Sequence, residues 1–207
     1  MNLEKLKAAE QRFLELHPQG FSDPSMQLIA KRHRMGKMVE FAQQSFSKEC
    51  YSHVDQTVAN MVKIINRSSM VSMFEKPKFR DFVGRLDQLQ RAYMVDALIE
   101  FLHGEQYAGF EALVELLLTE KIAKWSLLTI IPTYYAPTKE VFVKPTTAKG
   151  VIRYFEVENL AYKPAATWGF YKGYRSLINK TKKKVDKKLS PSNAAFSGFL
   201  MMSMDAI

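Results

Sequence analysis

The start of an expected helix near residue 146 carries groups that bind anions. The stretch Thr146-Thr147-Ala148-Lys149-Gly150 follows Pro145, and the N-terminus of a helix presents unpaired backbone amides that attract negative charge. Hydroxyl and ammonium groups at that position would add donors for a phosphate. The candidate anion site consists of Lys144, Thr146, Thr147 and Lys149. The alternative is ordinary helix capping by Thr146.

An enzyme that binds a phosphorylated small molecule would need a pocket beside this anion site. Trp125, Tyr134 and Tyr154 are candidates for its walls, and a filled interior there would count against it. The glycines form neither a dinucleotide-binding motif nor a P-loop. Acidic pairs suited to acid–base chemistry, such as Glu111 and Glu115, are expected on solvated helix faces. No motif specifies a reaction, so an enzyme is the third hypothesis.

The histidines and the single cysteine do not form a metal-binding pattern. Cys50 and His53 lie three residues apart with Glu49 beside them, but a structural zinc site needs four ligands. A Cys50–His53 nucleophile pair would need a third, orienting group. We expect packing and capping roles for these residues, and neither a metal nor a cofactor.

Addressing signals are missing from the sequence pattern. The first residues are amphipathic and do not resemble a secretory signal. The longest apolar stretch, residues 125–136, is too short to span a membrane and contains Pro132. One cysteine cannot form an intrachain disulfide, which fits a reducing compartment. These observations predict a cytoplasmic protein without a membrane partner.

The strongest charge feature is a run of lysines near the C-terminus. The chain has 207 residues and a formal net charge of +9, and residues 137–207 hold 13 basic against five acidic residues. The spacing of apolar residues predicts one helix over residues 168–189, about 33 Å long. Its buried stripe would comprise Tyr171, Tyr174, Ile178, Thr181, Val185 and Leu189. Its exposed ridge would comprise Lys172, Lys180, Lys183, Lys184 and Lys187.

A lysine ridge of this length matches the scale of a phosphate backbone. Five contacts to duplex DNA would give a slope of about −4.5 in log affinity against log salt. Lysine in place of arginine favours phosphate contact over base reading, which uses bidentate arginine. The alternative is a solvated face that serves solubility. A membrane surface is disfavoured because the apolar face of this helix is expected in the core.

A second basic cluster, Lys31-Arg32-His33-Arg34 with Lys37, lies where a helix is expected to end. Cations there would complement the negative end of the helix dipole. If this cluster lay beside the C-terminal ridge, the two would form one patch, and the sequence alone does not decide this.

The elements that carry these residues are helical throughout. Spacings near 3.6 predict helices over residues 3–16, 24–33, 37–46, 54–68, 78–103 (one helix or two), 111–118, 121–135, 146–155, 168–189 and 194–204. Ser52 would begin a capping box with Asp55, and Pro24 would start the second helix with Ser22 or Asp23 as its cap. Residues 140–144 would be extended or a short β segment.

Together these patterns predict an all-α, single-domain multi-helix bundle over residues 1–207, with the weakest candidate boundary near residues 137–145. At 47% hydrophobic residues, a chain of this size can bury a sizeable core without disulfides. Residues 121–135 are apolar almost all round, which favours a central buried helix that Pro132 kinks or ends.

The segments Trp125-Ser126-Leu127-Leu128-Thr129 and Phe142-Val143-Lys144-Pro145-Thr146, followed by Tyr162-Lys163-Pro164 and Trp168, resemble a pattern in bacterial proteins of uncharacterised function. The resemblance covers about a fifth of the chain. It implies a bacterial helical protein in which the Phe142–Thr146 turn matters, and it carries no activity.

The first hypothesis is therefore a noncatalytic helical protein that contacts nucleic acid or another polyanion through its lysine-rich C-terminal helix. The second is a protein–protein interaction or scaffolding module, with a homo-oligomer as one form of it. The final helix would then supply an adaptable contact surface, for which core packing is the alternative. Its residues are Phe196, Phe199, Leu200, Met201, Met202 and Met204.

Overall fold

Helices account for nearly all regular structure in the computed structural model, which describes residues 1–205. Its eleven α-helices are α1 (Leu3–Leu16), α2 (Pro24–His33), α3 (Met35–Ser45), α4 (Val54–Arg67), α5 (Glu75–Arg85), α6 (Gln88–His103), α7 (Gln106–Leu118), α8 (Trp125–Tyr135), α9 (Pro145–Tyr154), α10 (Trp168–Thr181) and α11 (Asn193–Asp205). Short 3₁₀ turns are η1 (Gly20–Ser22), η2 (Lys48–Ser52), η3 (Lys182–Lys184) and η4 (Lys187–Leu189). The predicted all-α multi-helix fold is confirmed.

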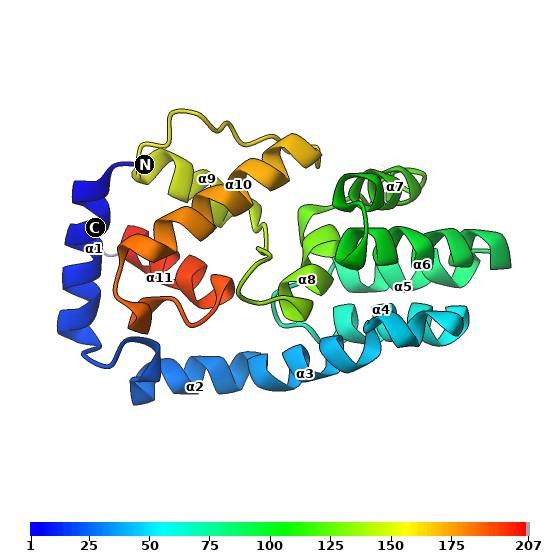
Figure 1. Cartoon of the computed structure of the whole chain (residues 1–207), viewed down its shortest axis with the longest axis horizontal. Coiled ribbons are helices and arrows are strands. Elements are labelled where there is room, and N and C mark those ends of the chain that lie inside the picture. The colour runs from blue at the N-terminus through cyan, green and yellow to red at the C-terminus, as the bar shows by residue number, and fades with distance from the viewer. Residues whose placement is uncertain (206–207) are drawn as a thin grey trace.

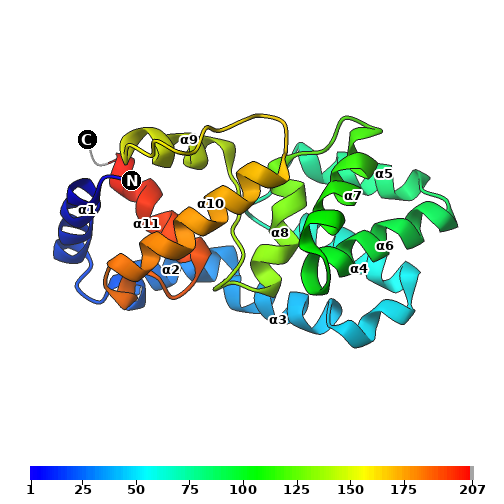
Figure 2. The ribbon, with the colours of Figure 1, turned by 45° about the horizontal axis from the view of Figure 1, so that its top comes forward.

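The helices form two groups that share α8 (Figure 1). Helices α4 to α7 make one group, and α1, α9, α10 and α11 make the other. Helices α2 and α3 run nearly end to end along one side of both groups, an arrangement that Figure 2 shows from a second direction. The buried apolar residues nevertheless belong to one continuous cluster, from Leu6 to Leu200.

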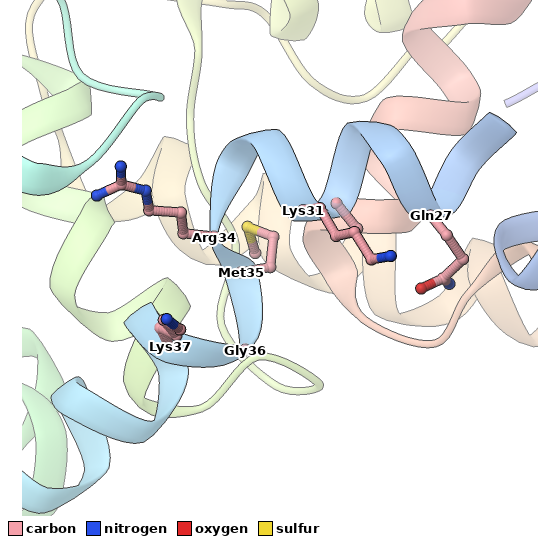
Figure 3. A pocket seen from close by; sticks show the side chains of 7 residues that line it. Gln27, Lys31, Arg34, Met35, Gly36 and Lys37 are labelled. Carbon is pink, nitrogen blue, oxygen red and sulfur yellow. The ribbon is translucent and has the colours of Figure 1, made fainter. Parts of the chain in front are cut away.

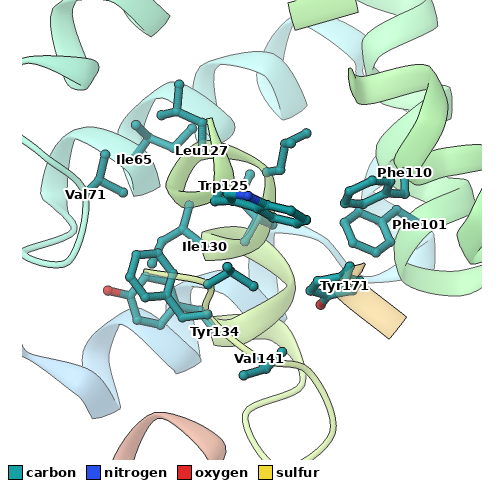
Figure 4. Packing of buried hydrophobic residues seen from close by; sticks show 14 of the residues in the cluster. Ile65, Val71, Phe101, Phe110, Trp125, Leu127, Ile130, Tyr134, Val141 and Tyr171 are labelled. Atoms are coloured by element: carbon teal, nitrogen blue, oxygen red, sulfur yellow. The ribbon is translucent and has the colours of Figure 1, made fainter. Parts of the chain in front are cut away.

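Helix α8 is buried on all sides, as the sequence predicts. Only Tyr135 among its residues is not fully buried. Figure 4 shows α8 between Ile65 and Val71 on one side and Phe101, Phe110 and Tyr171 on the other. The helix contains Pro132 and ends one turn later. Its polar groups are paired internally: the Thr129 hydroxyl donates to the Trp125 carbonyl at 2.7 Å and accepts from the Val143 amide at 3.0 Å.

Several helix ends follow local rules. Helix α1 ends at Leu16, as predicted, directly before His17-Pro18, and Asp23 caps α2 by accepting from the Ser25 amide at 3.2 Å. The proposed capping box at Ser52 is wrong, because Ser52 belongs to η2 and α4 begins at Val54 without a side-chain cap. The stretch 78–103 is two helices, separated where Asp87 and Gln90 form a capping box.

The link before α9 contains no strand. Residues 140–144 have no regular secondary structure, and the extended backbone of Lys144 (φ −93°, ψ 119°) fits the expected extended segment. Val141, Phe142 and Val143 are all buried. The link lies in the interior, where it forms side-chain contacts in place of a β ladder. None of the described helices is long and apolar enough to cross a bilayer.

Buried tyrosines make the stability of this fold sensitive to alkaline pH. Burial raises the pKa of Tyr134, Tyr171 and Tyr174 above the ordinary value of 10.0. Above pH 10 the unfolded chain loses these protons while the folded chain retains them, so the free energy of unfolding falls as pH rises. Each such tyrosine contributes a slope of about −1.4 kcal/mol per pH unit there.

Urea unfolding between pH 8 and 11 measures this effect. Tyr174→Phe is expected to make the alkaline slope shallower by one proton, whereas the same change at the exposed Tyr107 leaves the slope as it is. Equal slopes for the wild type and Tyr174→Phe would contradict the expectation.

Candidate anion-binding surface

The predicted C-terminal helix is shorter than expected. Helix α10 ends at Thr181, and residues 182–189, which were expected to continue it, contain the short 3₁₀ turns η3 and η4. The start at Trp168, capped by Thr167, is as predicted. We call residues 180–188 the basic turn. It contains Lys180, Lys182, Lys183, Lys184, Lys187 and Lys188.

A carboxylate from the other end of the chain diverts the backbone. The amide of Asp186 donates to Glu10 Oε1 of α1 at 2.6 Å, and Glu10 is also paired with Lys7 at 2.6 Å. Lysines spaced three and four residues apart would repel one another on a continued helix. Val185 adopts an extended backbone (φ −119°, ψ 167°), yet Val185 and Leu189 remain buried. The predicted buried stripe is therefore confirmed although the helix is not continuous.

The basic turn is also held from two other directions. Gly20 has φ +58°, and a Cβ there would lie 2.5 Å from the Lys188 carbonyl oxygen, so η1 and η4 touch through a glycine. The amine of Lys182 turns inward and donates to Asn193 Oδ1 at 2.7 Å and to the Thr138 carbonyl. Burial lowers the pKa of Lys182, and the neighbouring charge of Lys183 lowers it further.

The five lysines of the predicted site face solvent. Their side chains are exposed and none forms an ion pair with a carboxylate of residues 1–204; the five are Lys172, Lys180, Lys183, Lys184 and Lys187. Lys172 and Lys180 lie on α10, eight residues apart, whereas the other three lie on η3 and η4. The straight ridge is therefore wrong, and four of the five lysines gather at the basic turn.

The second candidate, at the start of α9, has a different geometry from the one expected. The helix begins at Pro145 with Lys144 as its N-cap residue, and Thr146 makes no capping hydrogen bond. Proline's fixed φ and missing amide suit the first helical position, which moves the start one residue earlier. Thr147 is buried, and Lys149 Nζ lies 5.0 Å from the ring centroid of Tyr162. Lys149 thus packs on the following loop.

The three aromatic residues expected to wall an enzyme pocket do not share one. The indole of Trp125 donates to the Lys163 carbonyl at 3.1 Å. The hydroxyl of Tyr134 lies 2.9 Å from Ser68 Oγ, whereas that of Tyr154 accepts from Arg12 at 3.3 Å. The core between α4 and α8 leaves a void of only about 10 Å³, which is too small for a substrate.

A buried polar cluster was missed by sequence reasoning. Arg175 Nη1 donates to both carboxylate oxygens of Glu140 at 2.8 Å, and the Tyr171 hydroxyl donates to the same carboxylate at 2.6 Å. Gln106 bridges the pair, at 3.1 Å to Glu140 and 2.9 Å from Arg175. The only sequence signal was an acidic residue directly before a buried stretch. Because every group is paired internally, this cluster joins α7, α10 and the 136–144 link.

Cys50 and His53 do not share a helix face. Cys50 lies in η2 and donates to the Gln44 carbonyl at 3.1 Å, while His53 is exposed at the start of α4. Within residues 1–205, no group of three or more histidine, cysteine or acidic residues is arranged to hold a metal ion.

The basic cluster around residue 34 is separate from the basic turn. It lies at the junction of α2 and α3, whereas the basic turn lies beside α1 and η1 (Figure 1). His33 Nδ1 lies 2.7 Å from Ser69 Oγ, which ties the end of α2 to the loop after α4. No hydrogen bond or ion pair among the described residues connects the two basic regions.

The final helix belongs mainly to the core. Phe196, Phe199 and Leu200 are buried, and Met202 and Met204 pack against the core from its edge. Core packing, the alternative expected for this helix, therefore accounts for Phe196, Phe199 and Leu200.

The resemblance of residues 125–168 to bacterial proteins remains an expectation. No protein-family model, no curated protein and no solved structure matches this chain.

Proposed function

We propose that this is a noncatalytic protein that binds nucleic acid or a similar polyanion through the basic turn, by contacts to phosphates. The observation that carries the proposal is the group of exposed lysines without an ion-pair partner at positions 180, 183, 184 and 187. Their flexible ammonium groups suit phosphate oxygens at variable positions and do not suit base recognition. A cytoplasmic location, expected from the single cysteine, would give such a surface access to nucleic acid.

Rigid support of the turn favours binding over mere solubility. Glu10 and the close approach of Gly20 hold its backbone, and Asn193 binds the side chain of Lys182, so the ordering of the turn occurs on folding and not on binding. Four lysines, at positions 180, 183, 184 and 187, can face one polyanion from this turn. Four contacts to duplex DNA predict a slope of about −3.6 in log affinity against log salt.

The expected result is salt-dependent binding that a local triple substitution weakens. Fluorescence anisotropy of a labelled 20-base-pair duplex, at 50, 100 and 200 mM salt, measures affinity and slope. Lys183→Gln, Lys184→Gln and Lys187→Gln together are expected to make the slope shallower by about 2.7, because three phosphate contacts are lost.

A charge-matched control distinguishes the turn from overall positive charge. Lys48→Gln, Lys78→Gln and Lys124→Gln remove three exposed lysines elsewhere and are expected to leave the slope near that of the wild type. No binding at 50 mM salt, or equal losses in the two triple variants, would refute the proposal. Thermal unfolding of each variant verifies that it is folded.

A further inference from the structure

The junction of α2 and α3 is a bend built on a left-handed residue. Arg34 has φ 52° and ψ 33°, and its amide closes α2 by donating to the Lys31 carbonyl at 3.0 Å. Helix α3 starts at the next residue, Met35. The bend leaves a hollow of about 650 Å³ on the surface (Figure 3). We call it the bend basin, and its lining residues are Gln27, Ala30, Lys31, Arg34, Met35, Gly36 and Lys37.

Three cations line this hollow. In Figure 3, the Lys31 side chain extends toward Gln27, the Arg34 side chain extends the opposite way along the bend, and Lys37 lies at the start of α3. All three cationic side chains are exposed, and none is paired with a carboxylate of residues 1–204. The acidic residue next along α3, Glu40, accepts a hydrogen bond from Gln44 at 3.4 Å.

Helix-dipole capping does not explain the whole arrangement. Lys31 lies in the last turn of α2, where a cation complements the dipole. Lys37, however, lies in the first turn of α3, where a cation opposes the dipole. A cation in that position gains stability when an anion is bound nearby.

The basin has the size and chemistry of a site for several linked negative charges. Ligand sites commonly measure about 300–1,000 Å³. An arginine fork with two lysines provides donors for many oxygen atoms, more than a single carboxylate can use. We propose that the bend basin binds a ligand that carries adjacent phosphate groups. This proposal depends on residues 27–37 alone and is independent of the basic turn.

The test uses Arg34→Gly because this substitution is expected to weaken ligand binding and to raise the stability of the fold. Glycine adopts positive φ without steric cost, so this variant is expected to unfold about 2–4 °C higher than the wild type. It also removes one cation of the basin. Lys121→Gly is the matched control, since Lys121 is exposed, has φ 58° and lies outside the basin.

Inorganic tripolyphosphate is the probe, with amide chemical shifts of the ¹⁵N-labelled full chain as the readout. We expect saturable shifts at residues 27–37 in the wild type, affinity at least ten-fold weaker in Arg34→Gly, and unchanged affinity in Lys121→Gly. The basic-turn triple variant is expected to retain these shifts even if the proposed function fails. Shifts confined to residues 180–188, no shifts at 5 mM probe, or equal weakening in both glycine variants would overturn the proposal.

A second arm identifies the source of the phosphates. A single-stranded oligonucleotide of ten nucleotides is added as a competitor. If it displaces tripolyphosphate from residues 27–37, the ligand of the basin is a nucleic-acid backbone. An oligonucleotide that leaves those shifts unchanged would assign it to a free oligophosphate. Either outcome supports a phosphate site once tripolyphosphate binds there.

Discussion

Arg175→Met is expected to lower the free energy of unfolding by about 3–5 kcal/mol. The substitution leaves the carboxylate of Glu140, whose side chain is 10% exposed, without its cation, and an uncompensated buried charge costs that much. The guanidinium also lies 5.5 and 5.3 Å from the ring centroids of Trp168 and Tyr171, so cation–π contacts are lost as well. Urea unfolding at pH 7 measures the change.

A double-mutant cycle with Glu140→Gln tests the cause. If the two side chains act as a pair, the double variant loses less stability than the sum of the single variants, by about 1.5 kcal/mol or more. Arg80→Met is the surface control, because Arg80 and Asp81 form a pair whose side chains are 61% and 52% exposed. Its expected cost is about 0–1 kcal/mol. Additive effects in the cycle would exclude the paired role of Arg175 and Glu140.

Gly109→Ala is expected to lower the free energy of unfolding by about 2–3 kcal/mol. Helices α6 and α7 pack so closely that a Cβ at Gly109 would overlap the backbone nitrogen of Phe101 and lie 2.5 Å from the Ala97 carbonyl oxygen. Both contacts are with backbone, which cannot rotate away as a side chain can. Separation of the helices would then disturb the packing of Phe101 on Phe110.

The control for this prediction is another helical glycine. A Cβ at Gly84, in α5, would meet no atom within 4 Å, so Gly84→Ala is expected to raise stability by about 0.5–1 kcal/mol through helix propensity alone. Thermal or urea unfolding of the two variants should therefore give changes of opposite sign. A Gly109→Ala variant as stable as the wild type would show that α6 and α7 can separate at little cost.

Helix starts and buried faces were predictable where neighbouring residues determine them. Asp23 with Pro24 and Thr167 before Trp168 act through hydrogen bonds and φ preferences within one turn. The nearly all-round apolar pattern of residues 121–135 similarly predicted a central helix, although the helix begins only at Trp125.

The end of α10 was unpredictable because a distant residue determines it. The spacing of Val185 and Leu189 fits a continued helix, and both residues are indeed buried. Glu10, 176 positions earlier in the chain, captures the amide of Asp186 and turns the backbone there. Helical periodicity predicts which side chains face the core. It carries no information on a hydrogen-bond acceptor, such as Glu10, that lies far away in the sequence.

The candidate site was predicted in part. Its exposed lysines followed from the apolar stripe opposite them, but their arrangement changed with the backbone. Lys182, which the predicted ridge did not include, is half-buried and donates to Asn193. Glu140 is an acidic residue that became a buried partner because Arg175, Gln106 and Tyr171 converge on it.

The central position of α8 has a consequence for synthesis on the ribosome. Helices α4, α6 and α7 all pack on α8 and precede it in the chain. Until Tyr135 leaves the exit tunnel, side chains such as Ile65, Leu98 and Leu113 lack their covering. A nascent chain stalled before that point therefore exposes an aggregation-prone apolar surface. A chaperone that binds nascent chains at the ribosome would have to cover this surface.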